Sequence, residues 1–118
     1  LKKNDFAVFK NKSSIFAMTG HLLFDKIDPD NCSTHSKKII KIIRNEIGFK
    51  KILISDDISM KALKYSVSKN TRMAFTAGCN IVLHCNGNFK EMNEVAKNSP
   101  LISKFVVDKT SQFRKIIS

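Results

Sequence analysis

The sequence lacks a long hydrophobic run, and this absence argues against two classes of protein. No stretch approaches the roughly 20 apolar residues that a membrane-spanning helix requires. The N-terminal residues Leu1 to Asp5 also lack the apolar core of a secretory signal peptide. We therefore expect a protein without membrane association that is located in the cytoplasm.

Cysteine is scarce, and its spacing is not that of a disulfide framework. The three cysteines, Cys32, Cys79 and Cys85, are an odd number, which is typical of a reducing compartment. Cys79, His84 and Cys85 are residue types that bind zinc, so a zinc site is one hypothesis. Adjacent residues of a strand point to opposite faces, however, so His84 and Cys85 cannot both bind one ion. We expect no metal site and no cofactor.

Acidic residues are few compared with basic ones, so the chain carries a large positive charge. Lys and Arg number 21 and Asp and Glu number 10, which gives a formal net charge of +11. Such a charge would favour a nucleic-acid partner if the lysines clustered, but the sequence has no Arg-rich run, aromatic interleaving or zinc-finger pattern. We expect no nucleic-acid partner, and a basic nucleic-acid-binding module is the least favoured alternative.

Length and apolar pattern indicate one α/β domain over residues 1–118. A chain of this length can bury one hydrophobic core but not two. The predicted strands are apolar throughout, which indicates a parallel sheet covered on both faces, yet three strands leave two open edges. Serine caps and glycine stops at Ser36, Gly48, Ser68 and Gly78 bound two of the helices. The predicted strands cover 14–19, 52–55 and 80–85, and the predicted helices cover 5–9, 36–47, 68–77, 89–97 and a segment after Pro100.

Two adjacent carboxylates, Asp56 and Asp57, follow the second predicted strand. The carboxyl ends of parallel strands are where α/β proteins place their chemistry, so Asp56 is the first catalytic candidate. Neighbouring side chains on a strand diverge, and Asp57 is the better candidate for capping the next turn. A magnesium site is weakly supported, because no D-x-D motif, P-loop or third acid at a strand end accompanies this pair. Loop 24–34 fails the calcium-binding EF-hand pattern, because Ile39 stands where a glutamate is required.

Two histidines have competing interpretations. His21 follows the first predicted strand, and His84 lies within the third. For each of them, a histidine near the core with a hydrogen-bond partner is the alternative to a functional role.

Three motifs in order resemble glycoside hydrolase family 3. The segment I-L-I-S-D-D-I-S-M (residues 52–60), preceded by Gly48-Phe49, is similar to the active-site signature of that family. M-T-G-H (residues 18–21) resembles its M-T-A-H strand end. A-G-C-N-I-V-L-H-C-N-G (residues 77–87) resembles the A-G-C-D-x-V-L-H-C-N-G of its bacterial β-N-acetylhexosaminidase branch. Lys51 departs from the glycine that the family usually has before the strand.

The resemblance implies the C-terminal part of a (β/α)8 TIM barrel, namely strands six to eight. Such a barrel needs about 250 residues and eight strands to close, which accounts for the open edges. The missing N-terminal half of the barrel is the expected partner.

The resemblance also implies a retaining glycosidase that removes terminal β-N-acetylglucosamine from peptidoglycan fragments during cell-wall recycling. Asp56 would be the nucleophile, and Met60 and His21 would line the sugar pocket. The general acid/base of this branch is a histidine in a K-H-F-P-G-H-G motif, which does not occur in this sequence. The chain should therefore be nearly inactive alone. A non-catalytic relic that binds sugar is the alternative.

Overall fold

Three parallel strands form one sheet in the computed structural model, which describes residues 15–20, 26–60, 63 and 65–117. The strands are β1 (Phe16–Met18), β2 (Ile52–Asp57) and β3 (Ile81–Leu83), and β2 lies in the middle. Both pairings are parallel. The predicted α/β fold with parallel strands is confirmed.

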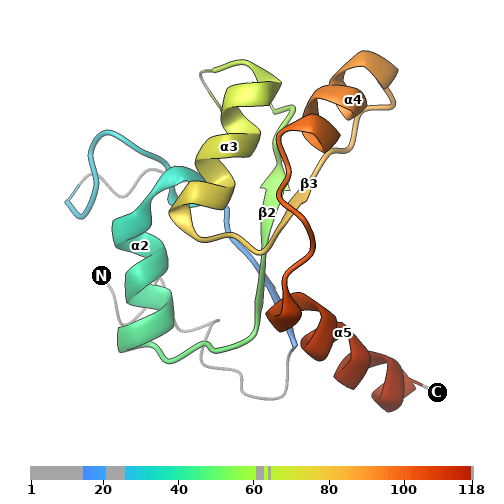
Figure 1. The fold of residues 1–118 in the computed structure, drawn as a ribbon. Coiled ribbons are helices and arrows are strands. Elements are labelled where there is room, and N and C mark those ends of the chain that lie inside the picture. Colours follow the sequence, from blue (N-terminus) through green and yellow to red (C-terminus); the bar gives the residue numbers. More distant parts are fainter. Residues whose placement is uncertain (1–14, 21–25, 61–62, 64, 118) are drawn as a thin grey trace.

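Helices follow each strand, as the apolar pattern predicts. Figure 1 shows α2 and α3 together on one side of the strands, α4 beside the end of β3, and α5 leading to the C-terminus. The predicted helix over residues 5–9 lies outside the described residues. The helical segments are η2 (Ser33–His35), α2 (Lys37–Lys41), the π-helix η3 (Ile42–Glu46), α3 (Val67–Ala77), α4 (Phe89–Lys97) and α5 (Lys104–Ile117).

The predicted ends of the first helix are confirmed. The Ser36 hydroxyl accepts a hydrogen bond from the backbone N–H of Ile39 at 3.1 Å, which satisfies one donor at the start of α2. Gly48 follows the helix with a φ of 82°, a left-handed conformation that glycine adopts without steric cost. The second half of the helix is a π-helix, which the apolar spacing did not distinguish from an α-helix.

The predicted cap of the second helix is wrong by two residues. Ser66, not Ser68, is the N-cap of α3 and accepts a hydrogen bond from Lys69 N at 3.2 Å. The hydroxyl of Ser68 instead donates to Glu94 Oε2 of α4 at 2.7 Å. The two serines are both compatible with a helix start, and only packing against α4 separates their roles.

The hydrophobic core lies between β2 and the helices α2 and α3. Leu53 of β2 is fully buried against the isoleucines of α2 and the alanines of α3. This arrangement follows from sequence, because a helix with apolar residues on one face must bury that face. The core cluster contains Ile39, Ile40, Ile43, Phe49, Leu53, Ala74, Ala77 and Cys79.

The prediction that all three strands are buried on both faces is wrong for the outer strands. Ile52 and Leu53 of β2 are fully buried, whereas Met18 at the end of β1 is 50% exposed and Leu83 at the end of β3 is 36% exposed. β3 also ends earlier than predicted, so His84 follows the strand rather than lying within it. Outer strands of a three-stranded sheet have a neighbour on one side only, which explains their exposure.

None of the helices in the described part of the chain has the length and apolar character needed to span a membrane.

Candidate active site

Asp57, the last residue of β2, is held by several hydrogen bonds. Its Oδ1 accepts from the backbone N–H of Ser59 at 3.0 Å and from that of Cys85 at 3.1 Å, and the Ser59 hydroxyl donates to both carboxylate oxygens. Burial raises the pKa of Asp57, but the bonds from Ser59 and Cys85 and the nearby His84 outweigh it, so the pKa lies below the usual aspartate value. Asp57 therefore braces the turn after β2, as predicted.

Asp56 is in a different environment, although it is the next residue along the chain. Its side chain is half-buried. Among the residues that the structure describes, its carboxylate accepts one hydrogen bond, from the backbone N–H of Asp57 to Oδ1 at 2.8 Å. A carboxylate with unused acceptor sites at the carboxyl end of a parallel strand is available for a ligand.

A β-bulge lies between Ile54 and Asp57 and comprises Ser55 and Asp56. Ile54 pairs with Ile81, and the next pair is Asp57 with Leu83. Two β2 residues therefore stand opposite one β3 residue, an arrangement that interrupts regular strand alternation. The predicted divergence of the two aspartates assumed a regular strand, and that assumption is wrong. Their different roles follow from the hydrogen bonds at this bulge.

Met60 lies in the loop between β2 and α3, close to the two aspartates. Its backbone N–H donates to Asp57 O at 3.2 Å, and its side chain is 42% exposed. Asn70 of α3 is buried and donates from Nδ2 to the carbonyls of Ile58, at 3.4 Å, and Tyr65, at 3.0 Å. Asn70 thus ties both ends of this loop to α3. Sequence reasoning missed it, because an asparagine in a helix gives no local sign of such contacts.

His21 lies outside the described residues, but the end of the strand that precedes it is defined. Thr19 donates its backbone N–H to Ile54 O at 2.9 Å, and its hydroxyl is 2.9 Å from that of Thr34. The hydroxyls of Thr34 and Ser33 both donate to Gly20 O. Sequence reasoning missed this hydroxyl cluster, which fixes the chain directly before His21.

His84 has a partner from α4. Its Nε2 lies 3.0 Å from Glu91 Oε1, and its side chain is 8% exposed. Asn86 Nδ2 donates to the same carboxylate oxygen at 2.9 Å. These bonds from His84 and Asn86 lower the pKa of Glu91. These contacts fit the structural interpretation of His84, a histidine near the core with a hydrogen-bond partner.

The cysteines of the proposed zinc set lie at opposite ends of β3. Cys79 precedes the strand and is buried, which raises the pKa of its thiol to about 11 and makes it unreactive at neutral pH. Cys85 follows the strand and is exposed, and desolvation together with the negative charges of Asp57 and Asp56 raises the pKa of its thiol. Within the described ranges, no three His, Cys, Asp or Glu side chains are grouped to hold a metal ion.

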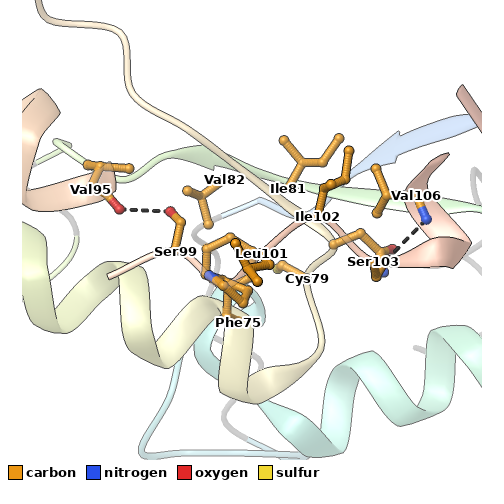
Figure 2. Close-up of a pocket in the computed structure, with 12 residues that line it drawn as sticks. Phe75, Cys79, Ile81, Val82, Val95, Ser99, Leu101, Ile102, Ser103 and Val106 are labelled. Atoms are coloured by element: carbon orange, nitrogen blue, oxygen red, sulfur yellow. Dashed lines mark hydrogen bonds between the residues drawn. The ribbon is translucent and has the colours of Figure 1, made fainter. Parts of the chain in front are cut away.

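An apolar cavity of about 460 Å³ lies in the helical layer rather than at the strand tips. Figure 2 shows Phe75 of α3, Val95 of α4 and Val106 of α5 around it, with Cys79 and Ile81 at the amino end of β3. The chain between α4 and α5 crosses this cavity and is anchored at its ends, by Ser99 Oγ donating to Val95 O and by Val106 N donating to Ser103 Oγ. Asp56 and Met60, the candidate site residues within the described part of the chain, do not line it.

A second cavity, of about 470 Å³, has a cationic lining. Lys37, Lys38, Lys69 and Arg72 line it together with Asp28 and other side chains of the loop before α2 and of α3. No residue of the described strands contributes to it, so this cavity is also separate from the carboxylates at the end of β2.

Comparison with known proteins identifies the family. The family model described as the glycosyl hydrolase family 3 N terminal domain matches residues 1–115. The beta-hexosaminidase of Nitrosomonas eutropha is 39% identical over 71 residues, which are 58% of this chain and 20% of that protein. The beta-hexosaminidase of Photobacterium profundum is 27% identical over 127 residues, which cover 99% of this chain and 38% of that protein.

A solved structure has the same fold. The crystal structure of a beta-N-acetylhexosaminidase from Beutenbergia cavernae superposes with a TM-score of 0.68 at 26% identity, covering 88% of this chain and 33% of that chain. The present chain thus spans 20% of one curated relative and 38% of another. The three-stranded parallel sheet is consistent with part of a barrel, and the chain belongs to glycoside hydrolase family 3.

Proposed function

We propose that this chain is the nucleophile-bearing segment of a retaining β-N-acetylglucosaminidase, with Asp56 as the nucleophile. The observation that carries the proposal is the contrast between the two aspartates at the end of the central strand. Asp57 accepts bonds from Ser59 and Cys85, whereas the Asp56 carboxylate retains acceptor sites. Family membership supports it, because Asp56 stands directly after Ser55 in the segment that resembles the active-site signature.

The proposed reaction has two steps. An Asp56 oxygen attacks the anomeric carbon as the bond to the leaving group breaks, which forms a glycosyl-enzyme ester. Water then hydrolyses this ester and returns Asp56 to its carboxylate form. Met60 and His21 are proposed to line the sugar site beside it. A general acid must protonate the leaving group in the first step, a contribution of ~10²–10⁴-fold, and the motif implied for it is not in this sequence.

The proposed substrates are peptidoglycan fragments with a terminal β-N-acetylglucosamine, and the proposed location is the cytoplasm. The proposed partner is a polypeptide that supplies the remaining strands of the barrel, with this chain as strands six to eight. The relatives named beta-hexosaminidase support the sugar, and their greater length supports the partner.

The test combines this chain with the N-terminal half of a beta-hexosaminidase relative. Asp56→Asn should nearly abolish hydrolysis of a chromogenic β-N-acetylglucosaminide, because losing the covalent route raises the barrier by several kcal/mol and each ~1.4 kcal/mol is tenfold in rate. Asp57→Asn is the matched control and should retain turnover when folded. A 5-fluoro glycoside should label the peptide containing Ser55 and Asp56, as read by mass spectrometry.

Two results would remove the assignment. One is an Asp56→Asn variant that keeps most of its activity, and the other is a label on a different residue. Binding of N-acetylglucosamine without any turnover in the reconstituted protein would favour the sugar-binding relic instead.

A further inference from the structure

The β-bulge at the end of β2 has a side-chain support of its own. Ser55 is fully buried, and its hydroxyl oxygen accepts a hydrogen bond from the backbone N–H of Leu83 at 3.0 Å. Leu83 is the residue of β3 with which the pairing resumes after the bulge. A bulge disrupts the ladder of backbone hydrogen bonds, so an acceptor on the bulged residue stabilises the strand pair where it is weakest.

The chain is also fixed on the other side of Asp56. Asp57 Oδ1 accepts from the backbone N–H of Cys85 at 3.1 Å, and the backbone N–H of Ile58 donates to Leu83 O at 2.9 Å. Asp56 therefore lies between Ser55 and Asp57. The side chains of these two neighbours accept hydrogen bonds from the backbone N–H groups of Leu83 and Cys85. The position of the Asp56 backbone is fixed by these contacts, while its carboxylate takes no part in them.

We propose that Ser55 is a positioning residue for Asp56, because its hydroxyl holds the bulge that brings Asp56 out of the regular strand pairing. The expected effect of Ser55 on kcat rests on the proposed function above. The Ser55 side chain acts through the backbone and has no contact with the reacting atoms. Alanine cannot accept the Leu83 hydrogen bond, and at a fully buried position an N–H group that loses its acceptor is costly.

The experiment compares Ser55→Ala and Ser55→Cys with the parent chain, each isotopically labelled and measured alone and with an unlabelled N-terminal half. Cysteine preserves the shape of serine but accepts hydrogen bonds weakly, so it decides the outcome if the alanine variant fails to fold. Thr71→Val is the matched control. Thr71 is fully buried and its hydroxyl donates to Val67 O at 2.8 Å, a bond within α3 that involves no strand residue.

Three readouts are expected to move in the Ser55 variants and to stay at parent values in Thr71→Val. Hydrogen exchange at the Leu83 amide should become roughly five- to tenfold faster, as expected for the loss of one hydrogen bond. The NMR chemical shift of the Asp56 carboxyl carbon at a fixed pH should change, because the backbone that carries this carboxylate moves. In the reconstituted protein kcat should fall by about 10²-fold with little change in KM, because small displacements of a reacting group have effects of that size.

The results separate this proposal from the proposed function. If the reconstituted parent protein has no turnover, the proposed function fails, and the Leu83 exchange rate and the chemical shift of the Asp56 carboxyl carbon still decide the role of Ser55. A Leu83 exchange rate and an Asp56 carboxyl chemical shift equal to those of the parent in both Ser55 variants would overturn the proposal. An equal loss of kcat in Thr71→Val would also overturn it, since the effect would then be general to buried hydroxyls.

Discussion

Asp57 is stabilised as a carboxylate, and this makes the folded state sensitive to acid. Its hydrogen bonds with Ser59 and Cys85 hold its pKa in the folded protein below the ordinary aspartate value, against the opposing effect of burial. The contribution of the Asp57 carboxylate to folding stability is therefore complete above its pKa in the unfolded chain. It is lost as the pH falls through the lower pKa of the folded state. Asp57→Asn should lower the free energy of unfolding at pH 7 by about 1.5–3 kcal/mol, the range for hydrogen bonds to charged groups.

Urea denaturation at pH 7 and at pH 3 measures this effect. The difference between the parent and Asp57→Asn should shrink at the lower pH. Asp108→Asn is the control, because Asp108 is exposed and its ion pair with Lys104 spans 3.9 Å on the surface of α5. A variant whose deficit is the same at both pH values would show that the Asp57 charge is not responsible.

A second prediction concerns Asn80, where the resembling motif has an aspartate. Asn80 Oδ1 accepts from Arg44 Nη2 at 2.6 Å and from the backbone N–H of Leu53 at 2.9 Å. Arg44 also donates to the carbonyls of Phe49 and Lys51. Asn80→Asp would turn the bond from Arg44 into an ion pair and the bond from Leu53 N–H into a charge-assisted one, and should raise stability at pH 7 by about 1 kcal/mol.

Thermal unfolding of Asn80→Asp and Asn98→Asp tests this idea. Asn98 Oδ1 accepts from Arg72 Nη1 at 2.8 Å in an exposed position. The ion pair created there should therefore add almost nothing to the stability of the fold. The gain at position 80 should disappear as the pH falls through the lowered pKa of the new carboxyl. Equal melting temperatures of Asn80→Asp and the parent at pH 7 would contradict the prediction.

At the scale of elements, glycine ends the helices before β2 and β3 under different constraints. Gly48 has a φ of 82°, and a Cβ added there would meet no atom of the described residues within 4 Å. Gly78 has a φ of 124°, and a Cβ there would lie 2.9 Å from Cγ2 of Ile40, which is buried in the core. Gly48→Ala should cost about 1–2 kcal/mol for the left-handed backbone alone, and Gly78→Ala should cost about 1–3 kcal/mol more for overpacking.

Chemical denaturation of the two variants gives the comparison directly. Gly87→Ala is a third variant, at a position with neither a positive φ nor a close contact among the described residues, and it should unfold like the parent. If Gly48→Ala lowered the free energy of unfolding as much as Gly78→Ala, the predicted extra cost of the contact with Ile40 would be contradicted.

At the scale of the whole molecule, large apolar side chains remain exposed. Phe89 is 74% exposed, Leu101 96%, Ile102 70% and Ile116 70%. Exposed apolar side chains of this size are expected where another polypeptide covers the surface, as the missing part of a barrel would. The isolated chain should therefore self-associate and bind a hydrophobic dye, and adding the N-terminal half of a relative should reduce both.

Light scattering after size-exclusion chromatography, with dye fluorescence on the same fractions, measures these properties. The outer strands of the described sheet, β1 and β3, give a second reason for association. An outer strand has backbone groups along one edge that can pair with a strand of another molecule. A monomer that binds no dye and unfolds in one sharp transition would contradict the prediction.

The sequence by itself determined the elements and their approximate ends. The apolar run of β2, the Ser36 cap and the glycines at 48 and 78 act through neighbours in the chain, so their effects are local and readable from the order of residues. The same locality allowed Asp57 to be predicted as the residue that braces the next turn. The motifs also indicated the family, since they are short segments in a fixed order.

The tertiary structure alone decided which distant residues complete the site. The bulge at Asp56 exists only because β2 pairs with β3, and the hydrogen bond from Leu83 to Ser55 joins residues 28 positions apart. The pairing of His84 with Glu91 required β3 to end before His84. The use of Ser66 rather than Ser68 as a cap depended on α4. Each of these depends on where separate segments meet, which the local residue pattern does not specify.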